Sequence, residues 1–123
     1  MSGSASRPVL LIVDDEARIL SALRRSLRRE GYEILTAESV SEGLRILASR
    51  PVNAVLSDQK MPGMSGLEFL GQVAARHPEV TRLLITGWPE EIPPDQIEQL
   101  GIRALIPKPW DDAELRSVLR ENT

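Results

Sequence analysis

Short apolar runs alternate with stretches of helical periodicity along the whole chain, and this alternation constrains the fold more than any other feature. Residues 9–13 and 54–56 contain apolar side chains only. Uninterrupted runs of this kind are typical of inner strands that are covered on both faces. Five strands that alternate with helices predict a parallel sheet with right-handed crossovers and helices on both faces. The sequence therefore predicts an α/β fold.

The predicted elements follow from this pattern and from the turn residues between them. Strands are expected at 9–13, at 33–37, in a run that ends at Asp58, at 82–86 and at 103–108, and helices at 16–30, 41–49, 65–76 and 111–119. The strand at 33–37 is the weakest of the five and is expected near an edge of the sheet. Prolines interrupt the segment after Gly87, so a fourth helix is short, about 95–100, with Pro94 at its first position.

The length of 123 residues fits one domain, which we place at 8–121 after a flexible lead-in at 1–7. The chain has no cysteine, which excludes disulfides and thiol chemistry. A net charge of -3 argues against direct binding of nucleic acid. The apolar run near the N-terminus is too short to span a bilayer, so we expect a cytoplasmic chain with no membrane contact.

Reactive side chains gather where the predicted strands end. They are Asp14 and Asp15 after the first strand, Asp58 at the end of the third, Thr86 at the end of the fourth and Lys108 at the end of the fifth. In a doubly wound sheet of order 2-1-3-4-5 the first and third strands are neighbours, so the three acids converge at its carboxyl end. Pro62-Gly63 and Gly66 mark a loop after Asp58, and we expect Asp58 to be presented there rather than buried.

Three converging carboxylates favour a bound cation. Each pair repels by roughly 4 kcal/mol at about 4 Å and an effective dielectric constant near 20, unless a carboxyl group is protonated or a cation binds. Oxygen ligands without a nearby His or Cys suit Mg²⁺ or Mn²⁺. Such a cation, with the Lys108 ammonium and the Thr86 hydroxyl, could also neutralise the oxygens of a phosphoryl group. Asp58 would then be the nucleophile.

Four motifs, each at a predicted strand end, resemble those of response-regulator receiver domains in two-component signal transduction. They are Asp14-Asp15, the 58–66 stretch with its Met-Pro-Gly-Met-Ser-Gly loop, Thr86-Gly87 and Lys108-Pro109. The resemblance covers residues 8–121 and implies a flavodoxin-like fold and a phosphorylation-controlled signalling switch, not an enzyme. It implies that Asp58 accepts a phosphoryl group from the phosphohistidine of a sensor histidine kinase or a phosphotransfer protein. An effector domain outside this chain and a homodimer are further candidate partners.

The same resemblance implies a Mg²⁺ site made of four residues. Asp15 would bind the ion directly and Asp14 largely through water. Asp58, the phosphoacceptor, would be a third ligand, and Lys60 would contribute its backbone carbonyl.

The resemblance also implies which residues contact the phosphoryl group. Thr86, with Gly87 beside it, would turn toward the group on activation, and Lys108 would pair with it. The bond between Lys108 and Pro109 would be cis, a geometry that only proline adopts at low cost.

Three further positions are candidates for the output surface: Trp88, Leu105 and Trp110. Receivers usually carry an aromatic residue three positions before the lysine, where this chain has Leu105. The two tryptophans, on the loops after the fourth and fifth strands, are candidate substitutes. The proline-broken segment after Trp88 departs from the long fourth helix that is common in the family.

Other functions fit parts of the sequence. The Asp14-Asp15-Glu16 run could simply begin a helix, because acids favour the positive end of its dipole. Leu105 and the broken fourth helix suggest a receiver-like interaction module that does not cycle phosphate. An aspartate-nucleophile phosphatase would need a D-x-D pattern after the first strand, where residue 16 is Glu. A flavin or nucleotide site would need hydroxyls and glycines where this loop is acidic.

Four arginines gather on the predicted first helix, at Arg24, Arg25, Arg28 and Arg29. Such a cluster is commonly a solvated face. Its functional interpretation is a docking surface for an acidic partner, and in receivers the first helix meets the kinase.

Overall fold

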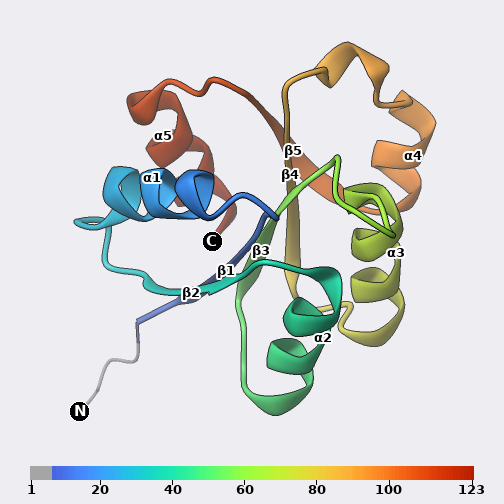
Figure 1. Ribbon diagram of the computed structural model, residues 1–123, viewed down its shortest axis with the longest axis horizontal. Helices are drawn as coiled ribbons and strands as arrows, with labels where there is room; N and C mark the ends of the chain where they lie inside the picture. The colour runs from blue at the N-terminus through green and yellow to red at the C-terminus, as the bar shows by residue number, and fades with distance from the viewer. Residues whose placement is uncertain (1–6) are drawn as a thin grey trace.

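A five-stranded parallel sheet in the order β2-β1-β3-β4-β5 organises the computed structural model, which describes residues 7–123 (Figure 1). The strands are β1 Val9–Val13, β2 Glu33–Ala37, β3 Ala54–Asp58, β4 Thr81–Thr86 and β5 Ile102–Pro107. This is the doubly wound order predicted from the sequence, and β2 lies at the expected edge. The predicted lead-in at 1–7, apart from Arg7, lies outside the described residues.

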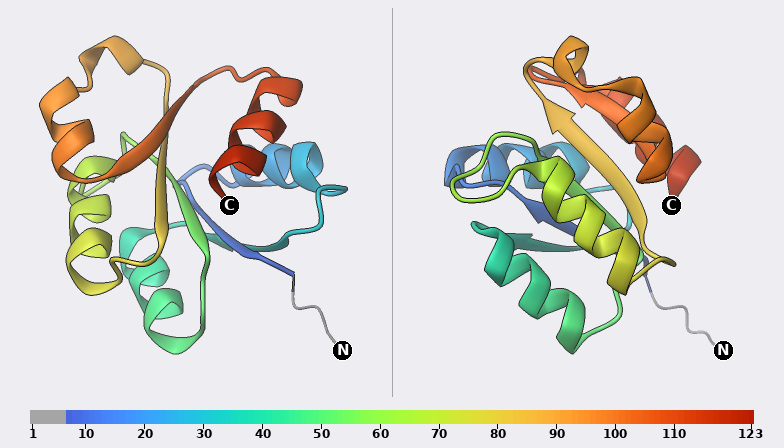
Figure 2. Two further views of the ribbon diagram at one scale, coloured as in Figure 1. Left: turned by 180° about the vertical axis from the view of Figure 1, so that it is seen from behind. Right: turned by 90° about the vertical axis from the view of Figure 1, so that its right-hand side faces the viewer.

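Helices cover both faces of the sheet. They are α1 Ala17–Leu27, α2 Val40–Ser49, α3 Gly66–Arg76, α4 Pro94–Gln99 and α5 Asp112–Asn122, with a 3-10 turn, η1, at Pro89–Glu91. Figure 2 shows α1 and α5 on one face and α2 and α3 on the other. The fourth helix has only six residues and begins at Pro94, as the sequence predicts.

Several boundaries differ from the sequence prediction, most of them by one residue, and α5 runs to Asn122 rather than ending at 119. The first helix ends at Leu27 rather than at Glu30, because Glu30 N–H donates to Leu27 O at 3.0 Å in a tight turn that Gly31 closes with a φ of 89°. The last strand ends at Pro107, so Lys108 lies just beyond it. The turn η1, with Pro89 at its first position, was not predicted, since the prolines there indicated only an interruption.

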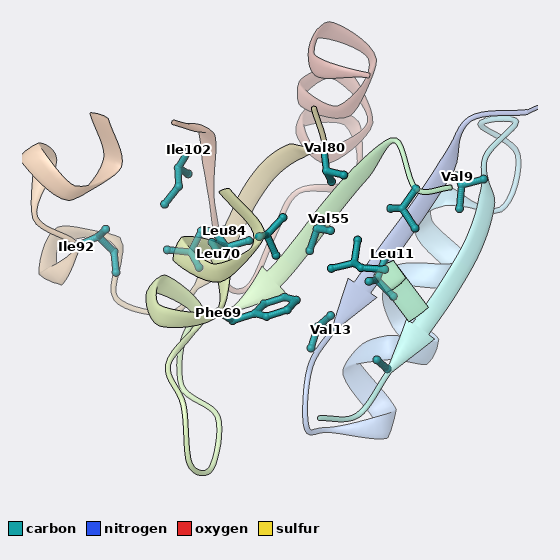
Figure 3. Packing of buried hydrophobic residues seen from close by; sticks show 14 residues of the cluster. Val9, Leu11, Val13, Val55, Phe69, Leu70, Val80, Leu84, Ile92 and Ile102 are labelled. Carbon is teal, nitrogen blue, oxygen red and sulfur yellow. The ribbon is translucent and has the colours of Figure 1, made fainter. Parts of the chain in front are cut away.

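Successive residues of the inner strands point to two separate apolar layers. Leu10 and Ile12 of β1 pack with α1 and α5, where Leu23 and Leu119 are fully buried. Leu11 and Val13 point the other way, toward α2 and α3 (Figure 3). The whole of β1 is therefore buried, which explains why its sequence contains no polar residue.

The start of α3 lies directly against the end of β3. Ser65 and Glu68 form a reciprocal capping box, with Ser65 Oγ accepting from Glu68 N–H at 3.1 Å and Glu68 Oε1 accepting from Ser65 N–H at 2.9 Å. A Cβ atom on Gly66 would overlap the carbonyl oxygen of Asp58 and lie 2.8 Å from Cδ1 of Leu84. Only glycine therefore allows α3 to begin this close to Asp58.

We expect Gly66→Ala to destabilise the domain by about 1–3 kcal/mol, because the backbone of Asp58 has to shift to admit the methyl group. Gly71→Ala, in the same helix, is the matched control. Its Cβ would meet Leu100 at an ordinary 3.5 Å, and alanine is the better helix former by about 1 kcal/mol. Urea denaturation of both variants measures their free energies of unfolding. An equal loss of stability in Gly66→Ala and Gly71→Ala would contradict the close-approach argument.

Candidate functional site

Three charged groups meet at the carboxyl end of the sheet. The ammonium of Lys108, just after β5, lies 2.9 Å from Asp58 Oδ1 at the end of β3 and 3.0 Å from Asp14 Oδ2 after β1. Asp14 has no exposed side-chain surface, and the Asp58 side chain is 8% exposed. Buried carboxylates need such a partner, since an unpaired buried charge is strongly disfavoured.

The backbone fixes the orientation of Asp14. Its own N–H donates to Ala37 O at 3.1 Å, and its Oδ1 accepts from Glu16 N–H at 2.9 Å, which leaves Oδ2 for Lys108. Asp14 thus does help to begin α1. That role accounts for only one of its two oxygens, because the other faces the ammonium group.

Asp58 is buried, contrary to the expectation that it would be presented at the edge. Its neighbours Ser57 and Asp14 are themselves buried, and Lys108 closes over the carboxylate. Burial raises the pKa of Asp58 above the ordinary aspartate value of 3.8; the hydrogen bond from Lys108 opposes this shift, and the charge of Asp14 adds to it.

Burial alone would lower the pKa of the Lys108 ammonium. Its hydrogen bonds to Asp58 and Asp14 outweigh this effect and raise the pKa above the ordinary lysine value of 10.5. The ammonium therefore keeps its charge at neutral pH. The site consequently has a fixed positive group beside two carboxylates.

A cation could join this cluster. Asp14, Asp15 and Asp58 each offer one carboxylate oxygen, and these oxygens lie within 4.8 Å of one another. Asp15 is exposed, so the cluster opens to solvent on its side. Hard divalent cations such as Mg²⁺ accept carboxylate oxygens and water together, and this donor set suits them.

The loop after β3 reaches toward the loop after β4. The ammonium of Lys60 lies 3.8 Å from the centroid of the Trp88 ring and 3.9 Å from Glu91 Oε1. The Lys60 side chain is therefore engaged with the β4–η1 segment. The metal-ligand role of its backbone carbonyl stays a prediction.

Thr86 is buried at the end of β4. This strand lies between β3, which ends at Asp58, and β5, which precedes Lys108. Thr86 Oγ1 accepts from Trp88 N–H at 3.1 Å, and the Thr86 carbonyl accepts from Lys108 N–H at 2.9 Å. Gly87 follows at an exposed turn. The Lys108–Pro109 bond is cis.

The structure does not bring the three candidate output residues together. Trp88 is 48% exposed beside η1, whereas Leu105 is half-buried against the α2–α3 layer. Trp110 packs on the opposite layer, with α1 and α5. These positions therefore do not form one surface.

The hydrogen bonds of the Trp110 indole were not predicted from the sequence. Its indole N–H points at Ser26 Oγ, 3.2 Å away on α1, and at Asp112 Oδ1, 3.0 Å away at the start of α5. The hydroxyl of Ser26 in turn donates to Asp112, which lowers the pKa of that carboxyl group. Contacts across 84 or more residues leave no signal in a single sequence.

Comparison with known proteins identifies the family. The sequence profile of the response regulator receiver domain matches residues 10–120. This chain belongs to that family.

No helix of residues 7–123 is both long and apolar enough to cross a membrane.

Several relatives are much longer than this chain. The hydrogenase transcriptional regulatory protein HoxA of Cupriavidus necator is 39% identical over 96% of this chain and 24% of its own length. The DNA-binding transcriptional regulator NtrC of Escherichia coli is 35% identical over 85% of this chain and 22% of its own length. The receiver domain described here thus spans about a quarter of these regulators.

Solved receiver structures share the fold over nearly their whole length. The signal receiver domain of an HD domain-containing protein from Pseudomonas fluorescens is 34% identical, with a TM-score of 0.87 over 95% of this chain and 94% of that chain. TrrA of Thermotoga maritima, a response regulator solved in complex with Mg²⁺ and BeF, is 30% identical, with a TM-score of 0.83 over 93% and 97%.

We expect Asp58→Asn to stabilise the metal-free domain at neutral pH by roughly 1 kcal/mol, the typical size of a single-site effect. Because burial raises the folded-state pKa of Asp58, its ionised form destabilises the fold. This penalty is full at neutral pH and disappears as the pH falls through the folded-state pKa toward 3.8. The stabilisation of the domain by Asp58→Asn must therefore shrink over the same pH range.

Urea denaturation in the presence of EDTA, at several pH values, measures this gain. Asp95→Asn, at an exposed position of α4, is the matched control and should change stability by less than about 0.5 kcal/mol at every pH. A pH-independent gain for Asp58→Asn would contradict the electrostatic explanation.

Proposed function

We propose that Asp58 accepts a phosphoryl group from a phosphohistidine and that the resulting acyl phosphate switches the domain. The observation that carries this proposal is the convergence of Asp14, Asp58 and Lys108 within 3.0 Å contacts at one buried point. In the transfer, the P–N bond of the donor breaks as a P–O bond forms to the Asp58 carboxylate. The freed imidazole leaves with the nitrogen electron pair.

Mg²⁺, or Mn²⁺ in its place, fits the oxygen donors of this site. Asp14, Asp15 and Asp58 would hold it, with the carbonyl of Lys60 as a further ligand. When bound, the ion supplies positive charge to the phosphoryl oxygens. The complex of the relative TrrA with Mg²⁺ and BeF supports this assignment.

Lys108 and Thr86 change their contacts when the phosphoryl group adds negative charge at Asp58. Lys108 exchanges its contact with the Asp58 carboxylate for one with a phosphoryl oxygen. Thr86 exchanges the N–H of Trp88 for the same group, and its hydroxyl then donates instead of accepting. Release of Trp88 frees the loop that leads into η1, and this transmits the signal.

The domain then acts as a signalling switch rather than as an enzyme. We place its boundaries at residues 8–121. Its phosphodonor is a sensor histidine kinase or a phosphotransfer protein, and its output is an effector domain outside this chain or a homodimer. We propose a cytoplasmic location, with no direct contact to nucleic acid or membrane.

A second candidate is a receiver-like interaction module that does not cycle phosphate. Two observations favour it. Leu105 stands half-buried where receivers usually carry an aromatic switch residue, and α4 has only six residues. The paired charges at Asp58 favour the phosphoacceptor.

The decisive experiment treats the purified domain with acetyl phosphate and follows its mass. We expect the addition of one phosphoryl group that depends on Mg²⁺ and is absent in Asp58→Asn. Asp95→Asn, an exposed acid outside the site, should be phosphorylated like the wild type. A folded wild-type domain that gains no mass, even with a histidine phosphodonor, would favour the interaction module.

Tryptophan fluorescence tests the path of the signal. We expect beryllium fluoride with Mg²⁺ to change the emission of Trp88, because its backbone holds Thr86 and its ring lies under Lys60. The change should persist in Trp110→Phe and vanish in Trp88→Phe. The opposite pattern would place the switch on the β5–α5 side.

A further inference from the structure

A basic groove lies between α1 and the edge strand β2. Its volume is about 600 Å³, and it is lined by Arg7, Ser21, Arg24, Arg25, Arg28, Tyr32, Glu33 and Ile34. Sites of this volume accommodate several side chains or a small ligand. Figure 1 shows α1 and the turn after it on the side of the sheet away from α4.

Three positions of α1 and its C-cap residue, Arg28, give the groove one continuous wall. Ser21, Arg24, Arg25 and Arg28 follow the i, i+3, i+4, i+7 spacing and so share one face of α1. Arg29 is outside this stripe, so only three of the four arginines of the sequence cluster line the groove. Arg7, at the start of β1, adds a fourth guanidinium group.

The arginines of the groove form no ion pair with another described residue. Among residues 7–123, no carboxylate lies within 4.0 Å of the guanidinium groups of Arg7, Arg24, Arg25 or Arg28. Glu33 lines the groove but pairs with Arg50 at 2.6 Å. In a chain of net charge -3, this concentration of arginines attracts an anionic partner.

The groove is remote from Asp58. Arg7, Tyr32 and Glu33 lie where β1 and β2 begin, whereas Asp58 ends β3 at the carboxyl edge of the same parallel sheet. A strand of five residues separates the two edges, about 16 Å of extended chain. A partner in the groove therefore does not cover the edge of the sheet where Asp58 lies.

We propose that this groove binds an extended acidic segment of a partner protein, in addition to the phosphodonor site at Asp58. Arginine forks bind carboxylates in a bidentate manner. The half-buried Ile34 offers an apolar contact, and β2, the edge strand of the described sheet, offers its outer backbone groups to an added strand.

The floor of the groove favours a protein over a nucleic acid. Tyr32 is only 9% exposed, and its hydroxyl is hydrogen-bonded to Thr123 Oγ1 at 2.9 Å, so its ring offers no stacking surface to a base.

The test uses a fluorescein-labelled peptide of glutamates and aspartates with one central leucine, and a control peptide with glutamine and asparagine in place of the acids. We expect the acidic peptide to bind the domain and the control peptide not to bind. Arg24→Glu/Arg28→Glu should weaken binding by at least about tenfold. Arg45→Glu/Arg103→Glu, with the same charge change at exposed positions of α2 and β5, should stay within about twofold.

Two further variants and three contrary outcomes separate this proposal from the alternatives. Asp58→Asn should bind the peptide as the wild type does, and Arg24→Gln/Arg28→Gln should reproduce the loss with intact phosphorylation by acetyl phosphate. Equal weakening in the two charge-reversed variants would overturn the proposal. So would tighter binding of a single-stranded oligonucleotide of equal charge, or self-association of the domain that Arg24→Glu/Arg28→Glu abolishes.

Discussion

One ammonium group between two buried carboxylates determines how the carboxyl end of this domain is arranged. Lys108 contacts Asp14 and Asp58, and so connects the ends of β1, β3 and β5 across the sheet. Neither carboxylate could be buried in its ionised form without this partner. The backbone of Lys108 is fixed in turn by its N–H bond to Thr86, so the strand that carries the hydroxyl also positions the lysine.

The charges of this cluster affect the stability of the fold and the binding properties of the site in opposite ways. Asp14, Asp15 and Asp58 gather around a single ammonium, which leaves the cluster with more negative than positive charge. The excess negative charge is unfavourable for the fold and favours the binding of a cation. Strain of this kind is common where a site is built for function rather than for stability. The two apolar layers, which are separate from the cluster, supply the stability.

Sequence reasoning reached the strands and the residues of the cluster because both depend on local signals, whereas the sheet order was taken from the known doubly wound arrangement. The apolar run of β1 and the acids that follow it can be recognised without knowledge of their neighbours. The burial of Asp58 could not be predicted, since it depends on how Lys108 closes over the carboxylate from a distant strand. The same holds for the bond of Trp110 to Ser26 and for the groove beside β2, which exist only once α1, α5 and β2 have packed.

The arginine stripe of α1 also bears on how that helix is held. Like charges at i, i+3 and i+4 disfavour an isolated helix, and Glu16 at its N-cap makes no side-chain cap bond within the described chain. Of its eleven residues, Leu20, Leu23 and Leu27 are the ones buried against the sheet. The helical state of α1 is therefore a property of the assembled core: the surface that carries the basic charge exists only as long as the hydrophobic layer beneath it is intact.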